Sequence, residues 1–67
     1  MVRLTVNGKE RQLHGPTTLQ AFLESLGVDI QHVAVALNGD VLDRADYPRV
    51  ILQDGDTLEI VRPVGGG

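Results

Sequence analysis

Apolar and polar residues alternate near both ends of the chain. Val2, Leu4 and Val6 share one face of an extended segment, and Leu58 and Ile60 repeat this alternation within residues 57–61. A period of two is typical of strands that bury one face. We therefore expect the first and last strands to lie side by side in the centre of a sheet.

A helical pattern lies between these strands. Its apolar residues fall at positions i, i+3, i+4 and i+7, on one face of a helix: Leu19, Phe22, Leu23 and Leu26. Thr17 and Gln20 have the spacing of a capping box at its start. Gly27 supplies the left-handed residue that ends it. The pattern predicts one helix of about ten residues.

Three further extended segments complete the predicted sheet. Residues 10–14 are polar, with Leu13 as an inward anchor, which favours an edge strand. Residues 33–37 are apolar and predict a buried strand, and residues 41–42 a short return strand. The Asn-Gly pairs at 7–8 and 38–39 are typical of tight hairpin turns.

The order of these elements predicts an α+β domain, with one main helix across one face of a mixed sheet of four to five strands. Residues 43–49 are expected to form a turn or a single helical turn. We assign residues 1–62 to this domain and residues 63–67 to a flexible C-terminal glycine tail.

Composition narrows the possible partners. The chain has 67 residues, no cysteine and a formal charge of −3, with six basic residues that are scattered along the sequence. Scattered cations do not predict a nucleic-acid surface. No run approaches the ~20 apolar residues of a membrane span, and no signal-peptide pattern begins the chain. We expect a cytoplasmic protein that binds neither nucleic acid nor membrane.

No pair of residues in the sequence can be assigned the roles of acid, base or nucleophile. His14 and His32 lack the spacing of a metal face or a nucleophile–base pair. Asp54-Gly55-Asp56 is interpreted as a turn, because a cation loop needs further oxygen ligands. No phosphate-binding glycine loop is present. We expect neither an enzyme nor a bound metal or cofactor, so any ATP is bound by another protein.

The last three residues, Gly65, Gly66 and Gly67, follow directly from the last predicted strand and Val64. Glycines lack a Cβ atom and can pass through a narrow channel that excludes other residues. Their backbone entropy makes them poor structural elements, so a role in a partner's active site is one interpretation and a frayed end is the other.

Four features occur together in this sequence: the apolar run at 33–37 with Asn38-Gly39, Arg44, Asp54-Gly55-Asp56 and the Val64 to Gly67 ending. With these features the sequence resembles the ThiS family over nearly the whole chain. The resemblance implies a ubiquitin-like β-grasp fold. It also implies a sulfur carrier for the thiazole ring of thiamine. Tyr47 departs from the family, where Trp is frequent at this position, and a packing role is expected for either residue.

The resemblance further implies a reaction at the Gly67 carboxylate. A ubiquitin-activating-like adenylyltransferase would adenylate it with ATP, and sulfur drawn from cysteine through a cysteine desulfurase would convert it to a thiocarboxylate. Thiazole synthase would then accept the sulfur.

A docking surface is predicted on the sheet face opposite the helix. Strand alternation places Ala34, Ala36 and Val61 there, and we group Arg62 and Val64 with them, with Arg3 as a further flank.

Three alternatives share the same sequence features. The carrier could deliver sulfur to molybdopterin or to tRNA. The chain could be a ubiquitin-like modifier that joins Gly67 to lysines of target proteins. It could also be a non-covalent interaction domain whose tail is incidental.

Overall fold

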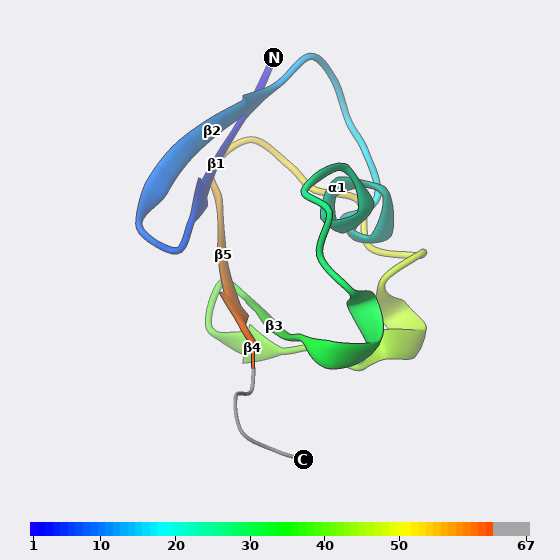
Figure 1. Ribbon diagram of the computed structural model, residues 1–67. Helices are drawn as coiled ribbons and strands as arrows, with labels where there is room; N and C mark the ends of the chain where they lie inside the picture. Colours follow the sequence, from blue (N-terminus) through cyan, green and yellow to red (C-terminus); the bar gives the residue numbers. More distant parts are fainter. Residues whose placement is uncertain (63–67) are drawn as a thin grey trace.

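The computed structural model describes residues 1–62 of the chain. The strands are β1 (Val2–Val6), β2 (Lys9–Leu13), β3 (Ala34–Leu37), β4 (Asp40–Val41) and β5 (Asp56–Val61), and the helix is α1 (Leu19–Ser25) (Figure 1). Two short 3-10 helices, η1 (Ile30–His32) and η2 (Arg44–Asp46), lie on either side of the β3–β4 hairpin in the sequence. This is the predicted order of elements, with boundaries that differ by about one residue in the strands. The predicted tail, residues 63–67, lies outside the described residues, so its boundary and flexibility stay predictions.

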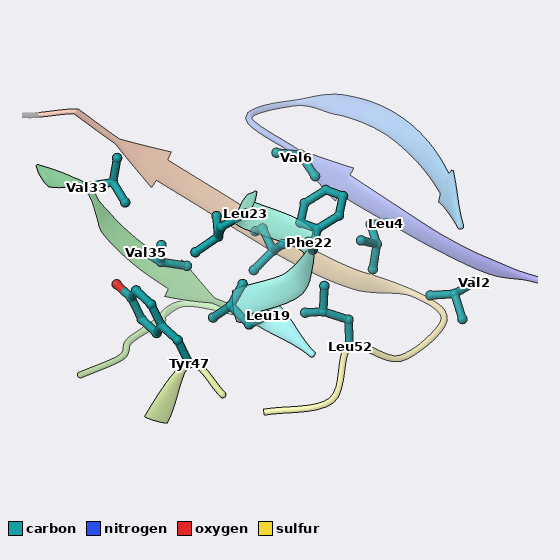
Figure 2. Close-up of a cluster of buried hydrophobic side chains, with 11 residues drawn as sticks. Val2, Leu4, Val6, Leu19, Phe22, Leu23, Val33, Val35, Tyr47 and Leu52 are labelled. Atoms are coloured by element: carbon teal, nitrogen blue, oxygen red, sulfur yellow. The ribbon is translucent and has the colours of Figure 1, made fainter. Parts of the chain in front are cut away.

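The five strands form one mixed sheet in the order β2-β1-β5-β3-β4. β1 and β5 are parallel, with Thr5 opposite Thr57 and Val6 opposite Leu58. The other neighbours are antiparallel. Figure 2 shows the blue β1 and the orange β5 pointing the same way, while α1 lies over one face of the sheet. The predicted pairing of the first and last strands and the β-grasp architecture are confirmed.

The core fills the space between α1 and this sheet. It consists of eleven buried residues from all parts of the domain (Figure 2): Val2, Leu4, Val6, Leu19, Phe22, Leu23, Val33, Val35, Tyr47, Leu52 and Leu58. Strand alternation decides which residues enter it, because every second side chain of β1 and β3 points toward the helix. The predicted buried strand at 33–37 is therefore only half-buried: Val33 and Val35 face the core, and Ala34 is exposed.

The helix begins one residue later than predicted. Thr18, not Thr17, is the N-cap, and its Oγ1 accepts a hydrogen bond from the N–H of Ala21 at 3.0 Å. The carbonyl of Thr17 accepts from the N–H of Leu52, and Thr18 forms a β-bridge with Ile51. Thr18 is extended, so α1 begins at Leu19, and with Leu26 as its C-cap it has seven residues instead of about ten. Within residues 1–62, no helix is long and apolar enough to cross a membrane.

An asparagine in each of two hairpin turns forms hydrogen bonds with the backbone of β5, one on each side of the strand. Asn7 and Asn38 both have a φ of 51°, as the Asn-Gly pairs predict. The Nδ2 of Asn7 donates to the carbonyl of Ile60 at 3.1 Å, and its Oδ1 accepts from the N–H of Ile60 at 2.8 Å. On the other side, the Oδ1 of Asn38 accepts from the N–H of Thr57 at 2.9 Å. The two turns thus hold the position of the central strand.

Replacing Asn7 should loosen one end of β5. Asn7→Gly keeps the left-handed backbone but loses both side-chain hydrogen bonds, so we expect the free energy of unfolding to fall by about 1–3 kcal/mol. Asn7→Ala should lose about 1–2 kcal/mol more, because a Cβ is strained at positive φ. Hydrogen exchange provides a local measurement: the Ile60 amide should lose more protection than that of Thr57. The control Asn38→Gly should reverse this order, and equal losses in both variants would contradict the role of the asparagines.

Tyr47 should stabilise the domain through its ring. The side chain is 2% exposed, and Figure 2 places its hydroxyl at the outer edge of the core. Tyr47→Ala should lower the free energy of unfolding by about 3–5 kcal/mol, which is comparable to the whole stability of a domain this small. Tyr47→Phe should change it by less than about 1 kcal/mol. Urea unfolding followed by far-ultraviolet circular dichroism suits a chain without tryptophan. A Phe variant as unstable as the Ala variant would show that the hydroxyl, not the ring, is needed.

Candidate functional site

The end of β5 is the point from which the predicted reactive tail continues. The predicted reactive residues Gly65, Gly66 and Gly67, together with Val64, lie outside the described residues. The structure does describe the residues that lead to them, Val61 and Arg62. The candidate site is therefore the surface around these two residues.

Three of the predicted docking residues do share the open face of the sheet. Ala34 pairs with Val61 across β3 and β5, and Ala36 pairs with Glu59. Paired residues on neighbouring strands point to the same side, and Val35 and Leu58 point to the other side, into the core. Val61 is 58% exposed, although it is a large apolar residue. These residues are confirmed as neighbours on one face.

A fourth apolar residue extends this group. Val41 in β4 lies opposite Ala36 and is 80% exposed. Sequence reasoning assigned residues 41–42 to a strand but gave Val41 no face. The Asn38-Gly39 pair is the signal that predicts this face, because a two-residue hairpin turn places Ala36 and Val41 on the same side of the sheet. We call Ala34, Ala36, Val41 and Val61 the apolar strip.

The structure does not bring the two expected flanking arginines to the apolar strip. Arg3 lies at the far end of the sheet, where its N–H donates to Asp54 at 2.8 Å and its carbonyl accepts from Gly55. Arg62 follows Val61 and so turns to the helix side, where it borders a depression with Val28 and Ile60. Arg62 was expected as a flank of the open face, and it lies on the helix side because alternation moves consecutive residues to opposite faces.

Arg62 belongs instead to a groove on the helix side. The groove has a volume of about 460 Å³ and lies between the β1–β2 hairpin, the end of α1 and the end of β5. Three cations border it, Lys9, Arg11 and Arg62, above the apolar side chains of Val6, Leu26, Val28 and Ile60. We call these seven residues the basic groove.

The basic groove corrects the prediction that the cations are scattered. Val6 pairs with Lys9 and Leu4 with Arg11, so both cations share the face of core residues. Because β1 and β5 run parallel, the hairpin end of β1 meets the C-terminal end of β5 near Arg62. Half of the six basic residues thus gather at one place. Residues separated by about fifty positions give no local signal of this.

A second depression, which shares Val28 and Arg62 with the groove, is bordered by a histidine–carboxylate pair. The Nδ1 of His32 lies 2.5 Å from the Oδ2 of Asp29, and the N–H of Gln31 donates to the other oxygen. The His32 hydrogen bond, followed by that of Gln31, lowers the pKa of Asp29 below its usual value. Both side chains are exposed, so the pair contributes little to stability. It caps the start of η1.

The remaining chemical candidates have structural roles. Gly55 has a φ of 91°, and the carboxylates of Asp54 and Asp56 accept from the backbone N–H groups of Arg3 and Gln53. The Asp54-Gly55-Asp56 segment is therefore a turn, as predicted. No cluster of three potential metal ligands occurs within residues 1–62.

Some known proteins similar to this chain have nearly its own length, and others are several times longer. A sulfur carrier protein ThiS from Thermus thermophilus is 40% identical over 62 residues, which are 92% of this chain and 95% of that protein. A thiazole synthase from Paramagnetospirillum magneticum is 42% identical over 66 residues, which are 98% of this chain and 20% of that protein. A thiazole synthase from Magnetococcus marinus is also matched over 20% of its length, at 36% identity. The chain thus spans about a fifth of the thiazole synthases that it matches.

A solved structure shows the same similarity in three dimensions. The crystal structure of the thiamine biosynthesis protein ThiS from Geobacter metallireducens has a TM-score of 0.86 and 36% identity, and the match covers 98% of this chain and all of that one. The ThiS family model matches residues 4–67, which include the closing glycines. Because this match and the Thermus relative each extend over more than nine-tenths of the sequence, the chain belongs to the ThiS family.

Proposed function

We propose that this protein carries sulfur for thiamine biosynthesis on the carboxyl group of Gly67. The observation that supports this most strongly is the ThiS family match, which continues through the glycines to Gly67. The Thermus relative that is matched along nearly its whole length is named a sulfur carrier protein. Within residues 1–62, the histidine–carboxylate pair of His32 and Asp29 is exposed and caps the start of η1.

The proposed chemistry needs two steps on one carboxyl group. An oxygen of the Gly67 carboxylate attacks the α-phosphorus of ATP, and pyrophosphate leaves. A cysteine desulfurase forms a persulfide from cysteine, and a second thiol breaks its S–S bond, which gives a disulfide and hydrosulfide. The hydrosulfide then attacks the acyl carbon, and AMP leaves with the oxygen. The product is a thiocarboxylate, whose ionised sulfur is a nucleophile as a thiolate is. An adenylyltransferase of the ubiquitin-activating type binds the ATP, and this chain binds no cofactor.

The length of the tail limits where this chemistry occurs. Gly67 follows Arg62 by five residues, so it lies at most about 18 Å from that residue. A partner that reacts with Gly67 must therefore contact the end of β5 with the surface around its active-site entrance. Glycines at positions 65–67 would fit a channel too narrow for a Cβ atom.

The apolar strip is the proposed docking surface for this partner. Its members Val41 and Val61 are more than half exposed, and apolar side chains that are grouped on an open sheet face are suited to contact with another protein. Val61 also lies two residues before Pro63, at the end of β5. Contacts there would position the tail for entry into the partner.

Thiazole synthase is the proposed acceptor of the sulfur. The support is that two relatives of this chain are parts of longer proteins named thiazole synthase, at 42% and 36% identity. A sulfur carrier and the enzyme that accepts its sulfur act together, so the two are suited to being joined in one polypeptide. No corresponding observation favours delivery to molybdopterin or tRNA, or attachment to lysines.

The first test is the intact mass of the protein. After incubation with ATP, a sulfur source and the adenylating enzyme from the same cells, the mass should rise by the difference between sulfur and oxygen. A variant without Gly66 and Gly67 should show no increase. If the full chain keeps its mass while the enzyme is active on its own substrate, the sulfur-carrier proposal is wrong.

A second test addresses the apolar strip. Ala36→Glu places an unpaired charge at its centre, so we expect binding to the adenylating enzyme to weaken at least about tenfold. Ala45→Glu makes the same change on exposed η2 and should bind as the unmodified protein does. Calorimetric titration measures both affinities, after thermal unfolding shows that both variants are folded. Equal affinities for the two variants would exclude docking through this strip.

A further inference from the structure

The basic groove contains apolar side chains that the domain itself does not cover. Leu26, Val28 and Ile60 pack against the core but remain half-exposed. The volume of about 460 Å³ can accept one or two aliphatic side chains from outside. An apolar group is therefore one part of what would fit here.

The charge around these side chains defines the second part. Lys9, Arg11 and Arg62 border the groove, and no carboxylate does so. Within the described residues, none of these three cations forms an ion pair within 4.0 Å. The chain as a whole has a charge of −3, so the groove differs in sign from its surroundings. A ligand segment that carries carboxylates would be attracted here and repelled elsewhere.

The position of the groove relates it to the tail. Arg62 is one of the three cations that border the groove, and it is also the last residue before Pro63. The two hydrogen bonds of Asn7 to Ile60 fix the β1–β2 hairpin, and with it Lys9, at this end of β5. Any enzyme that holds Gly67 in its active site thus presents its surface within about 18 Å of Arg62.

We propose that the basic groove binds an acidic segment of the adenylating enzyme, with an aliphatic side chain of that segment on Leu26, Val28 and Ile60. This deepens the proposed function and rests on it for the identity of the partner. The groove and the apolar strip lie on opposite faces of the sheet, so the enzyme would hold the end of β5 from both sides. The groove contacts would mainly raise the association rate and fix the orientation of the domain.

A nucleic acid fits the groove less well than a protein segment. Three cations neutralise few phosphates, and Phe22 and Tyr47, the two aromatic residues of the chain, are buried in the core. Stacking on exposed aromatic rings, which binds single strands, is therefore absent from residues 1–62.

Charge reversal provides the decisive measurement. Arg11→Glu should weaken binding to the adenylating enzyme at least about tenfold, mostly through slower association, and should reduce the dependence of the affinity on salt. Arg49→Glu is the matched control, because it makes the same change on an exposed residue that does not border the groove. It should change the affinity less than about twofold. Surface plasmon resonance at two salt concentrations measures both rates.

Lys9 allows a direct identification of the contact. It is the only lysine in the chain, so a carbodiimide, which joins amines to adjacent carboxylates, should link Lys9 to an aspartate or glutamate of the enzyme. Lys9→Arg keeps the charge and removes the amine. It should bind normally and lose the cross-linked peptide that contains position 9, whereas links through the Met1 amine or through carboxylates of this chain should remain. Mass spectrometry of the linked peptide should identify a segment with both acidic and aliphatic residues.

The outcomes separate the two proposals. If Arg11→Glu binds as Arg49→Glu does, while the unmodified protein still gains sulfur, the groove proposal is wrong and the sulfur-carrier proposal stands. If the unmodified protein neither binds the enzyme nor gains sulfur, both are wrong. Tighter binding of a single-stranded oligonucleotide than of the enzyme, lost in Arg11→Glu, would also overturn the protein segment as the occupant.

Discussion

The position of β5 in the centre of the sheet is the constraint on which the rest of the structure depends. It pairs with β1 on one side and β3 on the other, and an asparagine from each hairpin turn bonds its backbone. Leu58 of β5 is fully buried in the core. The strand that leads to the tail is thus held by two neighbouring strands and by two asparagine side chains. The residues before Pro63 are thereby held by both neighbouring strands, which suits the proposed reaction at Gly67.

The fold could be predicted from the sequence because its signals are local. Alternation at Val2, Leu4 and Val6, the helical spacing from Leu19 to Leu26, and two Asn-Gly pairs each fix their own element. The prediction was wrong where a distant segment intervened. Thr17 and Thr18 both look like N-caps, and only the pairing of this stretch with Ile51 and Leu52 decides between them. That pairing has no signature in the residues around Thr17.

The candidate site was less predictable, since it depends on how strands pair. Ala34, Ala36 and Val61 could be placed on one face because alternation acts within each strand. Val41 needed the register of the β3–β4 hairpin, and the basic groove needed the parallel register of β1 and β5. In sequence, Arg62 is about fifty positions from Lys9 and Arg11. Topology alone brings these charges together.

Alternation at the end of β5 also explains why one strand can present two different surfaces. Val61 belongs to the apolar strip, and the next residue, Arg62, belongs to the basic groove on the opposite face. The first surface consists of apolar side chains, with Glu59 opposite Ala36, and the second is cationic above apolar side chains. A partner that recognises only one of them could approach the tail from one side of the sheet. A partner that recognises both must contact the end of β5 from both faces of the sheet, and such contacts would fix the orientation of the domain more completely than contacts on one face.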